Sequence, residues 1–77
     1  MPRFYFHVHD GRDDPDPYGV ELPDQEAARR EAIRAAGEML RDWSGKLPIG
    51  SEWRMNVTDQ AGQPVVTLRF KTEEHRA

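Results

Sequence analysis

The stretch DQEAARREAIRAAGEMLRDW, residues 24–43, has the most regular pattern in the chain, and this pattern decides the fold. When successive residues are placed 100° apart, the apolar side chains fall on one arc and most charged side chains on the other. The apolar arc consists of Ala28, Ala32, Ile33, Ala35, Ala36, Met39, Leu40 and Trp43. The pattern predicts one amphipathic helix of about five turns over these residues. Asp24 can cap the free N–H groups at its start, and Gly45 marks its end.

Three other segments, residues 3–9, 52–58 and 64–71, alternate apolar and polar side chains, which is typical of half-buried strands. Their main apolar positions are Phe4, Phe6, Val8, Trp53, Met55, Val57, Val66, Leu68 and Phe70. These side chains are predicted to face the apolar arc of the helix. Val65 and the polar residues of the same segments are predicted to face away from it.

The connecting segments carry turn signals and one further short strand. Residues 11–18 predict a polar loop, and residues 20–22, which Pro23 ends, predict a short strand that returns along the first. Residues 59–62, Asp-Gln-Ala-Gly, predict a type I turn between the last two strands.

The predicted order of elements is therefore strand, short strand, helix, strand, strand, which defines an α+β fold. An antiparallel sheet with the helix on one face buries every apolar surface at once. We expect the strand order 2-1-3-4, with 2-1-4-3 as the alternative. Residues 1–71 form the single predicted domain, and residues 72–77 form a polar tail predicted to be disordered.

Length, charge and composition limit the classes of function. A domain of 77 residues has a small core, and a chain without cysteine has neither disulfides nor thiolate zinc sites to support it. Self-association is the remaining common source of stability. The net charge of −3 argues against a general attraction to nucleic acid or to a membrane surface. The sequence has no signal peptide and no apolar run long enough to span a membrane, so a cytoplasmic protein is expected.

The histidines and acidic residues offer two candidate metal sites, and neither pattern is complete. His7 and His9 lie two apart on one strand, and Asp10 follows, but a zinc site needs three or four fixed ligands. Two polar residues on the solvent side of a strand explain the histidines as well. The acidic loop, which includes Asp13 and Asp16, lacks the pattern of a calcium-binding loop. No nucleophile motif or phosphate-binding loop is present, so we expect neither an enzyme nor a cofactor.

The face of the predicted sheet away from the helix is the strongest candidate site. Its predicted interaction residues are Arg3, Tyr5, His7, Arg54, Asn56, Arg69 and Lys71, with His9 and Thr67 beside them and Glu52 as the main acid. An acidic protein would then present a basic, partly aromatic sheet surface. Such a surface could bind an acidic protein, a second copy of the chain or single-stranded nucleic acid. The simpler explanation is a polar surface that keeps the sheet soluble.

The helix also carries basic residues, but acidic residues stand beside them. Arg30, Arg34 and Arg41 lie three or four residues from Glu26, Glu31 or Glu38. This spacing predicts ion pairs along the solvent side of the helix rather than a phosphate-binding stripe.

Several of these segments together resemble a family of short bacterial proteins that is known only as a domain of unknown function. The resemblance lies in Met-Pro-Arg, aromatic residues and Phe-His at residues 1–7, Gly-Val-Glu-Leu-Pro-Asp at residues 19–24, the Ala/Arg-rich helix, and Val-Thr-Asp-x-x-Gly at residues 57–62. The proline-rich acidic segment at residues 13–17 departs from the family pattern. The resemblance implies the fold and implies no activity.

The sequence thus favours a small non-enzymatic module that binds another protein or regulates it, and that forms a homodimer through its sheet. One alternative is an accessory protein that binds nucleic acid weakly through the basic sheet face. The other is a metal-binding protein that uses His7 and His9.

Overall fold

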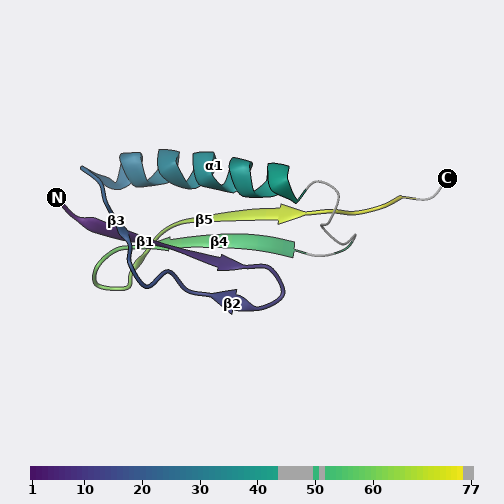
Figure 1. The fold of residues 1–77 in the computed structure, drawn as a ribbon, viewed down its shortest axis with the longest axis horizontal. Helices are drawn as coiled ribbons and strands as arrows, with labels where there is room; N and C mark the ends of the chain where they lie inside the picture. Colours follow the sequence, from purple (N-terminus) through teal and green to yellow (C-terminus); the bar gives the residue numbers. More distant parts are fainter. Residues whose placement is uncertain (44–49, 51, 76–77) are drawn as a thin grey trace.

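The computed structural model describes residues 1–43, 50 and 52–75. The elements are β1 (Arg3–His9), β2 (Asp13–Asp14), β3 (Val20–Glu21), α1 (Gln25–Asp42), β4 (Glu52–Thr58) and β5 (Pro64–Lys71). Figure 1 shows α1 lying over one face of an antiparallel sheet. The predicted α+β fold is confirmed.

The strand order also follows the sequence pattern. The sheet runs β2-β1-β4-β5, and β3 pairs with β1 on the same side as β2. For the four strands that the sequence predicts, this is the order 2-1-3-4 and not the alternative. The prediction was wrong in one detail, because Asp13 and Asp14 of the expected loop form β2 opposite Val8 and His9. A polar pair of residues gives no periodicity from which such a strand could be recognised.

The start of α1 is fixed by the predicted cap. Asp24 has an extended backbone, and its Oδ1 accepts a hydrogen bond from the Ala27 N–H at 2.8 Å. Trp43 caps the other end, and its N–H donates to the carbonyls of Met39 and Leu40. Gly45, the predicted stop, lies outside the described residues.

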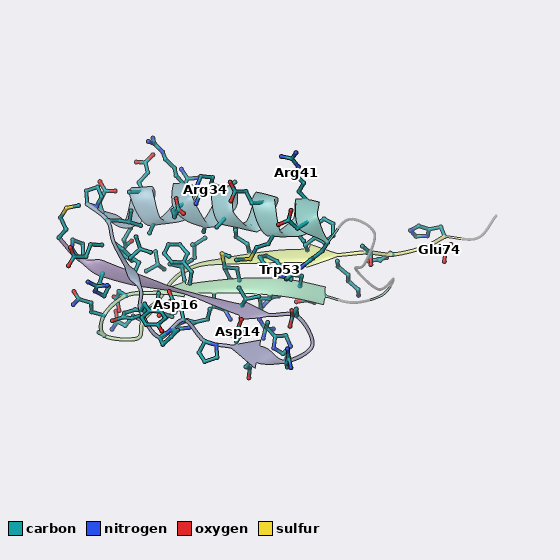
Figure 2. All side chains as sticks on the ribbon, viewed as in Figure 1. Asp14, Asp16, Arg34, Arg41, Trp53 and Glu74 are labelled. Atoms are coloured by element: carbon teal, nitrogen blue, oxygen red, sulfur yellow. The ribbon has the colours of Figure 1, made fainter. Side chains whose placement is uncertain are left out.

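The core lies between α1 and the middle of the sheet. Its buried side chains are Phe4, Ala28, Ala32, Ala36, Trp53, Met55 and Val57. The three alanines let the helix backbone approach the sheet closely, and the larger Trp43 packs edge-on against Trp53 near the end of the helix. Figure 2 shows Trp53 between helix and sheet, with Arg34 and Arg41 pointing away from the sheet.

The predicted facing of the strands is confirmed in the centre of the sheet and altered at the β5 edge. Phe6, Val8, Val66 and Leu68 are half-buried against the core. Phe70, however, is 40% exposed and Ile33 of the helix is 51% exposed, because no described strand lies beyond β5 to cover them. Val65, predicted to face away, packs against the core because the register shifts between Val57 and Thr58.

Among the described residues, no helix is both long and apolar enough to cross a membrane.

Candidate functional site

The face of the sheet opposite α1, here called the outer sheet face, is a surface of polar rows that cross three strands. Residues directly opposite each other in an antiparallel pair share a face. One row is His9, Arg54 and Arg69, the next is His7, Asn56 and Thr67, and flanking pairs are Tyr5 with Thr58 and Glu52 with Lys71. The residues predicted from the sequence are therefore brought together on this face. The one helix of the described residues lies on the other face (Figure 1).

Several of these side chains already have partners within the chain. Arg3 Nη1 donates to the Tyr18 carbonyl at 2.8 Å, and its Nη2 pairs with Glu21 at 3.2 Å, so Arg3 ties β1 to the segment before α1. Thr67 Oγ1 donates to Asn56 Oδ1 at 3.1 Å. Arg69 and Lys71 are exposed, and Arg69 Nε lies 3.8 Å from Glu52 Oε1.

The centre of the outer sheet face combines ring stacking with a cation. Tyr5 and His7 stack with their ring planes 5° apart and their centroids 6.3 Å apart. Arg54 is half-buried, and its Nε is buried without a hydrogen-bond partner in the described part of the chain. The planar guanidinium of an arginine carries donors whose geometry suits carboxylates and phosphates.

The carboxylate of Asp16 helps to hold the polar segment 10–19 against β1, beside the pairing of β2. Its Oδ2 accepts a hydrogen bond from the Phe6 N–H at 3.1 Å, and its Oδ1 accepts from the N–H groups of Tyr18 and Gly19 at 3.0 and 3.1 Å. Phe6 lies between the part of β1 that pairs with β3 and the part that pairs with β2. Asp16 therefore takes the place of a strand partner where neither short strand reaches.

The electrostatics of Asp16 fit this structural role. Partial burial acts to raise the pKa of the Asp16 carboxyl, but the hydrogen bonds from the N–H groups of Tyr18, Gly19 and Phe6, together with the neighbouring His7, outweigh it. The pKa of Asp16 consequently lies below its usual range, since hydrogen bonds to a carboxylate favour its charged form. From the sequence, Asp16 was considered only as a candidate calcium ligand. The pattern that indicates its structural role is Asp-Pro-Tyr-Gly at residues 16–19, which is typical of an Asx turn.

The two histidines proposed as metal ligands are occupied by other contacts. The Asp16 N–H donates to His7 Nδ1 at 3.0 Å, so the proton of the neutral ring lies on Nε2, which is 3.0 Å from Thr58 Oγ1. His9 Nδ1 pairs with Asp13 Oδ1 at 2.7 Å, while Asp10 is exposed. No group of three or more His, Asp or Glu side chains in the described ranges is arranged to hold a metal ion.

Of the three arginines of α1 that were predicted to form ion pairs, Arg30 and Arg34 do so, and Arg41 has no ion pair among the described residues. Arg30 contacts Glu26 at 3.1 Å, and Arg34 lies between Glu31 and Glu38. The hydrogen bond from Arg34 lowers the pKa of Glu31 and the same contact raises the pKa of Arg34. This side of the helix is therefore a self-paired solvent face.

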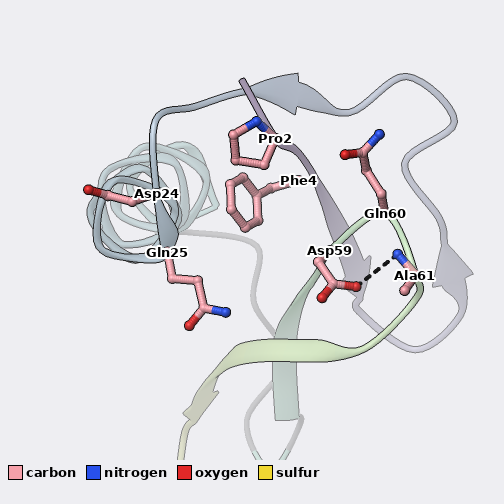
Figure 3. A pocket seen from close by; sticks show the side chains of 7 residues that line it. All are labelled: Pro2, Phe4, Asp24, Gln25, Asp59, Gln60 and Ala61. Atoms are coloured by element: carbon pink, nitrogen blue, oxygen red, sulfur yellow. Dashed lines mark hydrogen bonds between the residues drawn. The ribbon is translucent and has the colours of Figure 1, made fainter.

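A hollow lies between the start of α1 and the β4–β5 turn (Figure 3). It measures about 500 Å³ and is lined by Pro2, Phe4, Asp24, Gln25, Asp59, Gln60 and Ala61. Its carboxylates serve local structure, because Asp24 caps α1 and Asp59 accepts hydrogen bonds from the N–H groups of Ala61 and Gln63, both at 2.9 Å.

A smaller hollow of about 260 Å³, here called the edge groove, runs between α1 and β5. The residues that line it include Ile33, Ala36, Gly37, Leu40, Leu68 and Phe70. The lining is mostly apolar, and it includes the two large side chains, Ile33 and Phe70, that the core leaves exposed. The sequence analysis placed both side chains in the core and so did not foresee a groove here.

These features define a small α+β protein, in whose described residues one helix lies on an open antiparallel sheet. The chain belongs to the family described as Domain of unknown function (DUF6894), whose model matches residues 3–71. The resemblance drawn from the sequence is thereby confirmed. Comparisons with curated proteins and with solved structures gave no match.

Proposed function

We propose that this protein is a small non-enzymatic module that binds another protein or regulates it, and that it associates with its own copy through the sheet. The observation that carries the proposal is the uneven covering of the sheet. One face is packed against α1, whereas the described residues place no helix over the outer sheet face and no strand beyond β5. In a chain of 77 residues with so small a core, covering such surfaces with a partner adds stability.

The chemistry of the outer sheet face indicates the kind of partner. The row formed by His9, Arg54 and Arg69 concentrates basic groups, although the whole chain carries a net charge of −3. Tyr5 and His7 add a stacked pair of rings beside this row. Aromatic and arginine side chains are enriched where proteins bind proteins, so an acidic protein surface is the expected partner for this face.

Sedimentation equilibrium over a wide concentration range tests self-association. We expect the average mass to rise reversibly with concentration toward twice the chain mass of 8.9 kDa. Dilution of the concentrated sample is the control, since a specific dimer dissociates and an aggregate does not. A strict monomer at the highest concentration would remove self-association from the proposal.

Binding of single-stranded nucleic acid is a second candidate, which the row of His9, Arg54 and Arg69 favours. Fluorescence titration at low salt would then show weak binding that salt abolishes and that Arg54→Glu removes. Arg29→Glu on α1 is the matched control, because that arginine is exposed on the other side of the molecule. Failure of the unmodified protein to bind at low salt would exclude this candidate.

A further inference from the structure

We propose that a second copy of this chain docks along β5, so that the two β5 strands pair antiparallel about a two-fold axis at Leu68. The two α1 helices then pack side by side at Ile33. This inference rests on the proposed self-association and specifies the surface, the register and the symmetry of the dimer.

The two edges of the sheet differ in what covers them. On the β1 edge, β3 pairs at Arg3 and Phe4, β2 pairs at Val8 and His9, and Asp16 binds the N–H between them. On the β5 edge, the described residues include no further strand, and the edge groove exposes Ile33 and Phe70. A sheet edge with an apolar border is the usual site of strand addition.

The strand β5 is complementary to the β5 strand of a second copy in one register. Pairing Leu68 with Leu68 places Val66 opposite Phe70 on the helix side and Thr67 opposite Arg69 on the outer side. Moving the register by two residues one way brings Arg69 opposite Arg69, and like charges directly opposite are unfavourable. Moving it the other way places Phe70 opposite Pro64. A shift by one residue would set apolar positions against polar ones.

The helix α1 is placed so that the same two-fold axis would pass close to it. Glu26 and Arg29 lie beside Val66, whereas Ile33 lies beside Leu68, so helix and strand run in the same direction (Figure 1). From Val66 to Leu68 the strand advances by about 6.6 Å, which is the length of four to five helix residues. The step from Arg29 to Ile33 in the helix covers about the same distance. An axis through Leu68 therefore passes close to Ile33 as well.

The spacing of the two helices would also be suitable. The helix α1 contacts both β4 and β5, so the helix of a second copy would lie roughly two strand spacings away, or about 10 Å. Packed helices are typically separated by about 8–10 Å. Gly37 supports this contact, because a Cβ at this position would meet nothing within 4 Å among the described residues. The monomer therefore has no packing need for the glycine, which is unfavourable within a helix and allows another helix to approach.

The start of β5 limits how far such pairing extends. Pro64 lacks an N–H group, and the register shifts between Val57 and Thr58 at this end of the sheet. Both features commonly prevent pairing at a sheet edge. The proposed pairing accordingly runs from Val66 to Phe70, the part of β5 that lies beyond them.

Two lysine variants at half-exposed aliphatic positions test the surface. Ile33→Lys should weaken the dimer at least about tenfold, because it places two ammonium groups at the axis. Val20→Lys is the matched control on the covered edge, where Val20 is 43% exposed. Thermal melts at low protein concentration check that both variants fold, and sedimentation equilibrium measures the dimer.

A cysteine variant tests the register. The chain has no cysteine, so Leu68→Cys supplies the one thiol. Residues directly opposite in antiparallel strands have Cα atoms about 4.5–5.5 Å apart, within the range of a disulfide. Mild oxidation should convert most of this variant to a covalent dimer, and Val20→Cys should remain mostly monomeric under the same conditions.

The outcomes separate this inference from the proposed function. A dimer that Ile33→Lys weakens, and that Val20→Lys and Arg54→Glu leave intact, would support the β5 edge. A dimer that Arg54→Glu weakens and Ile33→Lys does not would overturn the β5 edge and leave association through the outer sheet face. A protein that stays monomeric at every concentration would overturn both the inference and the proposed self-association.

Discussion

The two edges of the sheet are covered to different extents by the described residues, although they belong to strands of similar length. The β1 edge is covered by a polar segment whose geometry depends on Asp16, Gly19 and two short strands. The β5 edge carries apolar side chains on one face and basic ones on the other, and the described chain leaves it open. A small chain can thus satisfy one sheet edge with local hydrogen bonds while the other edge has no strand beyond it among the described residues.

The two edges also contribute to the free energy of folding in different ways. Covering the β1 edge depends on hydrogen bonds between neighbouring segments, whose net contribution to the free energy of folding is modest for each bond. The apolar surface at the β5 edge contributes little in the monomer because Phe70 and Ile33 remain largely in water. Substitutions at matched positions on the two edges should therefore have unequal effects.

The largest expected effect comes from two phenylalanines on the same face of the sheet. Phe4 on β1 is 2% exposed and Phe70 on β5 is 40% exposed. We expect Phe4→Ala to lower the free energy of unfolding by about 3–5 kcal/mol and Phe70→Ala by about 1 kcal/mol. Urea unfolding at a protein concentration that keeps the chain monomeric measures both. Equal losses would show that the β5 edge is as well covered as the β1 edge.

The next effect tests the carboxylate that closes the β1 edge. Asp16→Ala removes the acceptor for the N–H groups of Phe6, Tyr18 and Gly19. We expect a loss of about 2 kcal/mol, below the sum for separate charged hydrogen bonds because the site is only partly buried. Asp16→Asn is the control, since its amide oxygen can still accept from Tyr18 and Gly19, and it should lose less. Hydrogen exchange at Phe6 should become faster in Asp16→Ala, and unchanged protection there would contradict this role.

A smaller effect is expected at the glycine that follows. Gly19 has φ +71°, and a Cβ there would lie 2.8 Å from Arg3 Cγ and 2.9 Å from Tyr5 Cε2. Gly11 has φ +106°, and a Cβ there would meet nothing within 4 Å. Both alanine variants carry backbone strain, so Gly19→Ala should cost about 1 kcal/mol more than Gly11→Ala because only it adds a steric clash. Thermal melts compare the two variants, and equal melting temperatures would show that β1 has room to move.

These residues also show what the sequence could reveal. Strong periodicity predicted α1, β1, β4 and β5 and their relative order, because alternating and helical patterns report directly on which face is buried. The Asp24 cap and the turn at residues 59–62 were also visible, since each depends on a few adjacent residues. In contrast, β2 has two exposed aspartates and no periodicity, so it could not be recognised.

The candidate surfaces were harder to predict than the fold. The outer sheet face followed from alternation alone, but the hydrogen bonds of His7 depend on a segment that folds back over nine residues. The edge groove depends on which strand is last in the sheet. Periodicity assigns Ile33 and Phe70 to the buried face, and only the strand order shows that nothing in the described chain lies beyond them.

The smallest expected effect concerns pH and again distinguishes the β1 edge. The pKa of Asp16 is lower in the folded protein than its ordinary value near 4, so its charged form stabilises the fold at neutral pH. This contribution is complete above about pH 5 and is lost as the pH falls through the lowered pKa, because the unfolded chain then binds the proton more readily. The pKa of Glu31 is also lowered, but Glu31 is present in both proteins, so its contribution cancels when they are compared. The difference in free energy of unfolding between the unmodified protein and Asp16→Asn should therefore shrink below about pH 4. A difference that stays constant from pH 7 to about pH 3 would show that the hydrogen bonds to Asp16 do not depend on its charge.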